Sequence, residues 1–304
     1  MKYSEAILKS WTGPLSDSEE QRAENAVNMI RSAIEGSDEL KTMDIEVFTQ
    51  GSFANNTNVR AESDVDVCVM LKDIFHCELP DGRSSEDYGF TSAKLSFFDY
   101  RDMVKRALQK KFREEYVEDG NKSLKIHENT YHVNADVVPA IQLRNYCYGR
   151  GTKRSSYVEG TWLMSKNYLE VKNYPKIHIA NGRDKNSATN FKYKKLVRIM
   201  KHIKNNMVDD YATNGDKITS FLVECLVWNV PNEIITGYST WTVTLREVIR
   251  YLDHEIGAGG HTEWGEVSDI LYLFHNGRKW TDQDAKQWLV DAFNYLGYSD
   301  EKSW

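Results

Sequence analysis

The chain has 304 residues, with 39 lysines and arginines against 45 aspartates and glutamates, and its formal net charge of −6 argues against tight, non-specific binding of nucleic acid. Its length allows one large domain or two modest ones. It has no apolar run long enough to cross a bilayer, no signal-peptide pattern at the start and no paired cysteines, so we expect a cytoplasmic protein with reduced thiols and no membrane contact.

The first predicted elements are a helix and a strand. Ser16 and Glu19 have the spacing of a capping box, which starts a helix. Apolar residues then recur at helical spacing, and Gly36 is suited to ending the helix. Residues 43–50 (MDIEVFTQ) alternate apolar and polar side chains, which is typical of a half-buried strand.

Gln50, Gly51 and Ser52 follow directly, and we interpret them as a phosphate-binding turn. Backbone N–H groups and the serine hydroxyl can bind phosphate oxygens there, and glycine permits a close approach. Twelve residues after Ser52, Asp64 and Asp66 stand in a run of valines that predicts a strand (ESDVDVCVML). Because side chains alternate along a strand, the valines would face the core and both aspartates the opposite side.

A second strand could supply a third carboxylate. Residues 131–141 (YHVNADVVPAI) have a strand-like pattern that is bounded by Pro139. This strand would place His132, Asn134 and Asp136 on one face. Asp136 is therefore the natural partner of the aspartate pair, although taken alone it could be an ordinary surface acid.

The rest of the chain is dominated by helical patterns. A polar stretch at residues 172–190 is predicted to be a loop that borders a site. We therefore predict an α+β front half, residues 1–155, and an all-helical back half, residues 156–304. Amphipathic or apolar helices are expected at residues 100–108, 191–207, 218–231, 244–256 and 282–297.

The three aspartates indicate phosphoryl transfer. In two-metal sites one ion lowers the pKa of an attacking hydroxyl, and the other neutralises the triphosphate and the leaving pyrophosphate. We therefore assign Asp64, Asp66 and Asp136 as catalytic, metal-binding residues for two Mg²⁺ or Mn²⁺ ions. The alternative for Asp64 and Asp66 is a solvated strand face.

These motifs resemble a known superfamily. Gly-Ser, a spacer with Thr57, Asp-Val-Asp and a distant third aspartate resemble the polymerase-β-like nucleotidyltransferases. Residues 191–204 (FKYKKLVRIMKHIK) and 218–231 (ITSFLVECLVWNVP) are similar to the helical lobe of the bacterial CD-NTases, the cGAS/DncV-like branch. The resemblance covers roughly residues 20–300. It implies a nucleotidyltransferase core, with a mixed sheet and flanking helices, plus a C-terminal helical lobe that completes the nucleotide pocket, and an active site in the cleft between them.

The resemblance also implies residues for the donor triphosphate. In that family a lysine of the first of these helices and a serine of the second hold it, and Lys201 and Ser220 fit these positions best. Residues 183–204 carry eight basic side chains and one acid, which agrees with a polyphosphate site. Ser220 could instead cap its helix. Three other lysines compete with Lys201: Lys194, Lys195 and Lys204.

The activity implied by the resemblance is synthesis of a second messenger. Such an enzyme condenses nucleoside triphosphates (ATP, UTP or others) into a cyclic di- or trinucleotide, here one that could contain uridine, and releases pyrophosphate in anti-phage (CBASS-type) signalling. The zinc cluster and basic N-terminal arm of the animal members are missing from the sequence, so activation by double-stranded DNA is not expected. A regulatory protein partner is compatible with the sequence.

Other functions remain open. A nucleotidyltransferase that acts on an RNA 3′ end, a protein or a small molecule would use the same aspartates, although an RNA-tailing enzyme should carry a longer basic track. A catalytically silent nucleotide-binding protein would be expected to lack one of the acids. Tyr238 could stack on a base. Four asparagines could recognise a base or simply form turns: Asn173, Asn181, Asn186 and Asn190.

Overall fold

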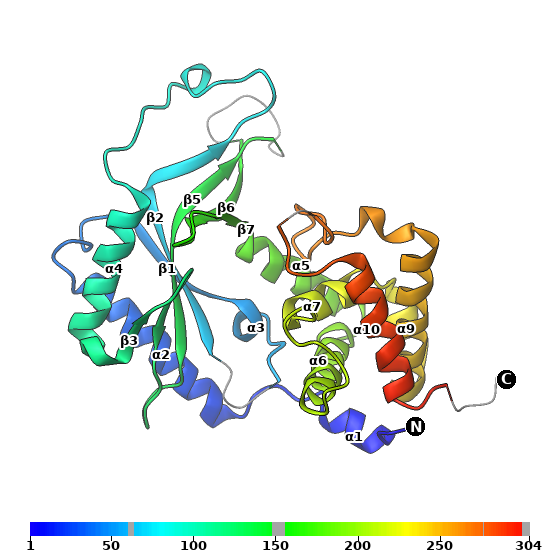
Figure 1. The fold of residues 1–304 in the computed structure, drawn as a ribbon. Helices are drawn as coiled ribbons and strands as arrows, with labels where there is room; N and C mark the ends of the chain where they lie inside the picture. The colour runs from blue at the N-terminus through cyan, green and yellow to red at the C-terminus, as the bar shows by residue number, and fades with distance from the viewer. Residues whose placement is uncertain (60–63, 148–155, 276, 300–304) are drawn as a thin grey trace. The chain divides into compact units, whose positions relative to one another are not determined.

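The computed structural model of the protein describes residues 1–59, 64–147, 156–275 and 277–299 (Figure 1). The chain forms two compact units, which differ from the predicted division at residues 155–156. It passes between them four times, because one unit has three segments and the other has two. The helical unit comprises Met1–Leu15, Asn55–Val59 and Ile177–Trp304, and the sheet unit comprises Ser16–Ala54 and Arg60–Lys176.

The sheet unit is built on a mixed seven-stranded sheet (Figure 1). Its strands run in the order β1-β2-β5-β4-β3, while β6 pairs with β5 and β7 pairs with β6. The pair β2–β5 is parallel and the other pairs are antiparallel. The strands are β1 (Ile45–Gln50), β2 (Val65–Glu78), β3 (Val117–Asp119), β4 (Leu124–Ile126), β5 (Ala135–Asn145), β6 (Val158–Met164) and β7 (Glu170–Asn173).

Two helices of the sheet unit pack on the same apolar core as the central strands. Val65, Val67 and Val69 of β2 are buried in this core together with Ile30 and Leu108 of the two helices. The predicted alternation is confirmed, and it leaves Asp66 on the other face of the sheet. The helices of this unit are α2 (Asp17–Glu35), α3 (Gly51–Ala54), η1 (Glu86–Tyr88), α4 (Phe97–Phe112) and η2 (Glu114–Tyr116), and α2 has the predicted capping box and ends at Gly36.

The strand predicted to be bounded by Pro139 continues through it. On the side of β5 away from β2, strand β4 pairs with residues 135–137 and strand β6 with residues 141–145. Pro139 therefore lies where neither strand pairs with β5, and a missing N–H on that side costs no ladder hydrogen bond. The strand also begins later than predicted, at Ala135.

The helical unit has a core of leucine, isoleucine and valine side chains from most of its helices. All four helices predicted in this half are present. Glu5 of α1 accepts hydrogen bonds from the backbone N–H groups of Trp241 and Thr242 at the start of α9. The helices are α1 (Glu5–Ser10), α5 (Pro175–Ala188), α6 (Tyr193–Asp209), α7 (Ser220–Trp228), α8 (Asn232–Thr236), α9 (Trp241–Ala258), η3 (Gly260–Glu263) and α10 (Asp282–Tyr295).

The loop predicted at residues 172–190 is wrong, because this segment contains the end of β7 and the whole of α5. The physical reason is Pro175, which stands at the first helical position, where its fixed φ and missing N–H favour a helix start. Among the described residues no helix is long and apolar enough to cross a membrane.

Candidate active site

A row of polar side chains crosses the face of the sheet opposite α2 and α4. Asp66 of β2 lies opposite Asp136 of β5 in the parallel register. On the outer sides, Gln50 of β1 lies opposite Asp66, and Lys125 of β4 lies opposite Asp136. Neighbouring strands are about 4.8 Å apart, so the two aspartates stand side by side. Lys125 was not predicted from the sequence, since β4 has only three residues and no clear pattern.

Asp64 precedes β2 and is exposed, whereas Asp66 is half-buried. Burial and the negative charges of Asp136 and Asp64 raise the pKa of Asp66 to about 7. Burial and the charge of Asp136 also raise the pKa of Asp64. The predicted triad is therefore brought together closely enough for its members to repel one another.

The predicted phosphate-binding turn consists of Gln50 at the end of β1 and the first two residues of α3, Gly51 and Ser52. Gly51 has a φ of +66°, a region that glycine adopts far more easily than other residues. A Cβ at this position would lie 2.9 Å from Cγ of Asp66 and would overlap its carboxylate. Glycine is therefore required at this position for two reasons: the positive φ of the backbone and the close approach of the Asp66 carboxylate. Ser52 is half-buried, and its hydroxyl makes no hydrogen bond with any described residue.

The donor set of the triad fits a divalent cation. It consists only of carboxylate oxygens, which are the ligands that Mg²⁺ and Mn²⁺ prefer. Burial and the neighbouring carboxylates raise the pKa of Asp66, and a bound cation would relieve the repulsion between these carboxylates. In the parts of the chain that the structure describes, no three His, Cys, Asp or Glu side chains are already gathered as a metal-binding cluster.

In the helical unit, Lys201 is in a buried ion pair. Its ammonium nitrogen lies 2.6 Å from Oε2 of Glu224 and donates a hydrogen bond to Oγ1 of Thr57 at 3.0 Å. Thr57 in turn donates to Oε2 of Glu224 at 2.9 Å, and Nε2 of His178 lies 3.1 Å from Oε1. Against the effect of burial, the charge of Lys201 and the hydrogen bond with His178 hold the pKa of Glu224 well below its usual range.

This group of side chains was not predicted from the sequence, and we call it the Glu224 cluster: Thr57, His178, Lys201 and Glu224. Lys201 was expected to bind phosphate, and its side chain is only 2% exposed. A phosphate oxygen would have to replace Glu224 or Thr57 as a partner of its ammonium group. Lys194, on the same helix, is half-exposed, and its ammonium group has no hydrogen-bond partner among the described residues. Burial lowers the pKa of Lys194.

Ser220 does not cap its helix. The N-cap of α7 is Thr219, whose side chain accepts a hydrogen bond from the backbone N–H of Leu222 at 3.1 Å. Ser220 is the first helical residue and half-buried, and its hydroxyl makes no hydrogen bond with any described residue. The hydroxyl therefore remains available to a ligand.

Two of the candidate base-binding asparagines have structural hydrogen bonds. The side chain of Asn181 donates to the carbonyl oxygen of Val267 at 2.8 Å, and that of Asn186 accepts from the backbone N–H of Lys194. Asn190 has a positive φ of 51°, as expected for a turn residue. Asn173 is the last residue of β7, and Tyr238 is half-buried.

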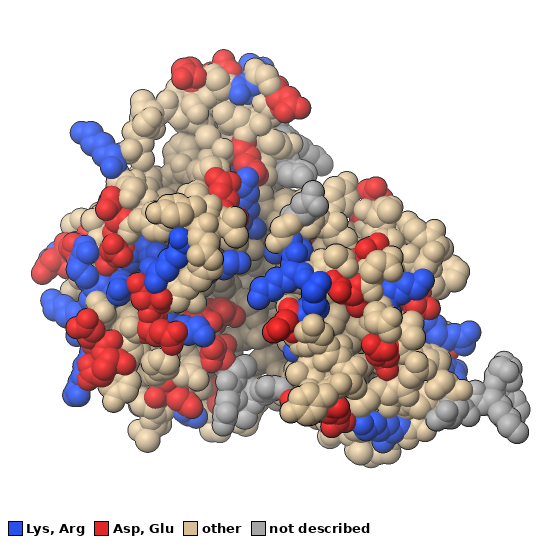
Figure 2. Space-filling model, in the orientation of Figure 1, with Lys and Arg blue, Asp and Glu red and all other residues tan. Residues whose placement is uncertain are grey.

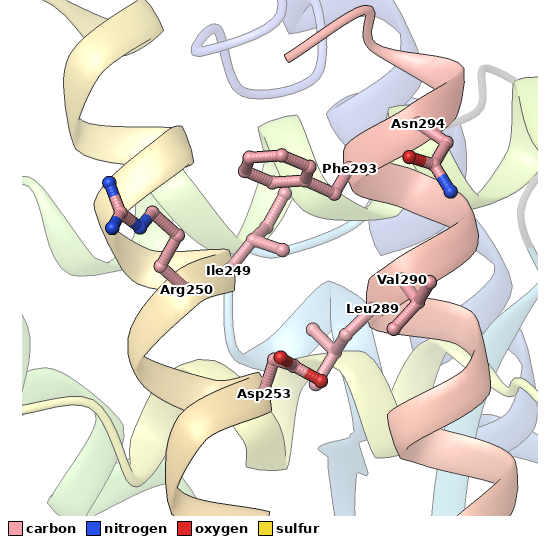
Figure 3. Close-up of a pocket in the computed structure, with 7 residues that line it drawn as sticks. All are labelled: Ile249, Arg250, Asp253, Leu289, Val290, Phe293 and Asn294. Atoms are coloured by element: carbon pink, nitrogen blue, oxygen red, sulfur yellow. The ribbon is translucent and has the colours of Figure 1, made fainter. Parts of the chain in front are cut away.

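One pocket of the helical unit lies apart from the predicted residues. It is a groove of about 250 Å³ between α9 and α10, with an apolar wall that includes Ile249 and Phe293 and a carboxylate from Asp253 (Figure 3). None of the predicted site residues lines it. On the face of the molecule in Figure 2, acidic and basic side chains of the described residues are interspersed on each unit.

Two family models match the chain, one in each half. A family model described as a nucleotidyltransferase domain matches residues 30–163. A second, described as the cGAS/DncV-like nucleotidyltransferase C-terminal helical domain, matches residues 180–297. Together the two models cover both the aspartate triad and the Glu224 cluster, apart from His178.

Relatives match over almost the whole chain. Cyclic dipyrimidine nucleotide synthase CdnE of Cecembia lonarensis is 44% identical over 298 residues, which are 98% of this chain and 99% of that protein. Cyclic dipurine nucleotide synthase of Elizabethkingia meningoseptica is 32% identical over 303 residues, 98% of this chain and all of that protein. The structure of Rhodothermus marinus CdnE c-UMP-AMP synthase with Apcpp and Upnpp superposes with a TM-score of 0.86 at 28% identity, covering 99% of each chain. The chain therefore belongs to the cGAS/DncV-like nucleotidyltransferases, the CD-NTase family, and is a nucleotidyltransferase.

Proposed function

We propose that the protein condenses nucleoside triphosphates into a cyclic di- or trinucleotide that contains a pyrimidine, and releases pyrophosphate. The observation that carries this proposal is the side-by-side placement of Asp66 and Asp136 with Gly51 against the Asp66 carboxylate. A pyrimidine is favoured because the relative named for dipyrimidine products is 44% identical and the one named for dipurine products is 32% identical. The biological role that we propose is bacterial anti-phage (CBASS-type) signalling, without activation by double-stranded DNA.

In this proposal Asp64, Asp66 and Asp136 hold two Mg²⁺ or Mn²⁺ ions. The bound ions supply charge neutralisation for the triphosphate and a lowered pKa for the acceptor hydroxyl. The crowded carboxylates support the assignment, since their repulsion in the free protein favours binding of a cation.

The protein's own groups would bind and orient the donor triphosphate. The backbone at Gly51 and the hydroxyl of Ser52, which has no partner among the described residues, would bind phosphate oxygens, with Gln50 beside them. Ser220 would add a second hydroxyl. Lys201 would contribute its ammonium group by exchanging one of its present partners for a phosphate oxygen.

The test is to incubate the purified protein with each labelled nucleoside triphosphate, singly and in pairs, with Mg²⁺ or Mn²⁺ and without DNA. Products are treated with phosphatase and separated by chromatography and mass spectrometry. A phosphatase-resistant product that contains uridine or cytidine, made by the wild type and not by Asp66→Asn, would support the proposal. A product made only of purines would contradict the pyrimidine assignment. Transfer of label to RNA or to the protein itself, with no cyclic product, would contradict the cyclase proposal.

A further inference from the structure

Asp136 accepts a hydrogen bond from a residue that neither the sequence motifs nor the proposed mechanism includes. The hydroxyl of Ser123 donates to Oδ1 of Asp136 at 3.1 Å. Ser123 lies in the turn between β3 and β4, two residues before Lys125, which pairs with Asp136. The other carboxylate oxygen, Oδ2, accepts no hydrogen bond from the described residues. Asp136 therefore has one oxygen engaged by a neutral donor and one available.

A buried arginine donates hydrogen bonds to the turn that carries Ser123. Arg101 of α4 is only 3% exposed, and its guanidinium donates to the carbonyl oxygens of Gly120 and Ser123 at 2.8 and 3.4 Å. The same guanidinium lies 2.7 Å from Oδ1 of Asp119, the last residue of β3. Five fixed donors in one plane can hold several acceptors at once, which a lysine could not do in the same way.

Two lysines complete the support of the turn. Lys105 and Lys166 each lie 2.9 Å from the carboxylate of Asp119, and Lys166 also donates to the backbone carbonyl of Asp119 at 2.7 Å. Against the effect of burial, hydrogen bonds from Lys166, Lys105 and Arg101 hold the pKa of Asp119 far below its usual range.

We propose that Ser123, held in place by Arg101, is a positioning residue that fixes the orientation of the Asp136 carboxylate. The terminal torsion of an aspartate is broad, so an unsupported carboxylate adopts a wide range of orientations. A hydroxyl donor on Oδ1 restricts this rotation and presents Oδ2 in one direction. Partners of this kind around a metal-binding carboxylate typically change metal affinity or activity about 10- to 100-fold when they are removed. The inference rests on the proposed role of Asp136 in binding a divalent ion.

The experiment compares Ser123→Ala and Ser123→Thr with the wild type. A matched control is Ser32→Ala in α2, because the Ser32 hydroxyl is exposed and, among the described residues, bonds only the carbonyl oxygen of Asn28 in its own helix. Binding of Mn²⁺ alone is measured by electron paramagnetic resonance at fixed pH, without nucleotide. The midpoint of thermal unfolding and the values of kcat and KM for the best substrate pair are measured in parallel.

We expect Ser123→Ala to bind Mn²⁺ about 10-fold more weakly and to lose a similar factor in kcat, with KM and the unfolding midpoint little changed. Ser123→Thr and Ser32→Ala should match the wild type in all four measurements. Wild-type Mn²⁺ affinity in Ser123→Ala would overturn the inference, and so would a loss of affinity that Thr does not restore. Failure of the proposed function can be distinguished from failure of the inference about Ser123. If the proposed function is wrong, the wild type makes no cyclic product, but the Mn²⁺ titrations still compare the metal affinity of the variants.

Discussion

The ammonium nitrogen of Lys201 lies 2.6 Å from Oε2 of Glu224, and the two side chains are only 2% and 6% exposed. Removing one member of a buried ion pair leaves an uncompensated charge and typically costs about 3–5 kcal/mol, whereas replacing both can be nearly neutral. This pair therefore allows the structural contribution of Lys201 to be separated from any contribution to substrate binding.

We predict that Lys201→Met lowers the free energy of unfolding by about 3–5 kcal/mol, and that adding Glu224→Gln recovers most of the loss. The measurement is denaturant unfolding of the two variants, followed by substrate titration of the double variant. If Lys201 binds the triphosphate, KM in the double variant stays well above the wild-type value although stability has returned. A wild-type KM in that variant would assign the lysine a purely structural role, and Lys194→Ala would be titrated next.

Asp66 should make the metal-free protein less stable at neutral and alkaline pH. Its pKa is about 7 in the folded protein and near 3.8 when unfolded, so the folded state binds the proton more tightly. The resulting stabilisation is full below pH 3.8 and is lost as the pH rises towards 7. The asparagine in Asp66→Asn has no group that ionises. With allowance for partial solvation, we expect this variant to be about 2 kcal/mol more stable than the wild type at pH 8.

The measurement for Asp66→Asn is thermal and denaturant unfolding in a chelator at pH 5 and pH 8. The difference in stability between Asp66→Asn and the wild type should be smaller at pH 5. At pH 8, Mg²⁺ should reduce this difference because it stabilises only the wild type. Nucleotide transfer by this variant should fall by several orders of magnitude. A variant less stable than the wild type at pH 8 without metal would mean that burial and the neighbouring carboxylates do not raise the pKa of Asp66 in the folded protein.

Gly51→Ala should abolish activity, and Gly82→Ala provides its control. Both glycines have positive φ, of 66° and 76°, so each substitution costs roughly 1–2 kcal/mol of backbone strain. Only at Gly51 does the new Cβ meet the Asp66 carboxylate, because nothing lies within 4 Å of a Cβ at Gly82. Unfolding and turnover are measured for both. Normal turnover in Gly51→Ala would show that the Asp66 carboxylate can move aside without loss of function.

Thr219 and Ser220 are adjacent hydroxyl residues with different predicted effects. Thr219→Ala removes the N-cap of α7 and should cost about 1 kcal/mol of stability with little change in KM. Ser220→Ala removes a hydroxyl without a described partner, so it should leave stability unchanged and raise KM for the triphosphate. Thermal unfolding and substrate titration of both variants test these two predictions. A Ser220→Ala variant with unchanged KM would remove this residue from the site.

The aspartate face of the sheet could be predicted because it depends on local alternation. The valines of β2 determine which way Asp66 points, without reference to the rest of the chain. The placement of Asp136 beside them also needed the assumption that β2 and β5 are neighbours, which the structure confirms.

The Glu224 cluster could not be predicted because its members are far apart in the chain. Thr57 and Glu224 are separated by 167 positions and Thr57 and Lys201 by 144. A basic run normally indicates a solvated helix face, so nothing local distinguished the one buried lysine from its neighbours. Ser123 was missed for a related reason, since a serine in a short turn carries no signal until the strand beside it is known.

The interleaving of the two units in the chain has a consequence for biosynthesis. Leu8 is fully buried in the helical core, and the N–H of Lys2 donates to the carbonyl oxygen of Leu296. Lys2 and Leu8 are synthesised long before Leu296, so they reach their folded surroundings only after α10 has been made. The sheet unit can fold before α10 is synthesised, whereas the core of the helical unit is complete only after α10 has been made. A nascent chain stalled before that point would expose the apolar side of α1, and so would a fragment cut at residue 155 or 176.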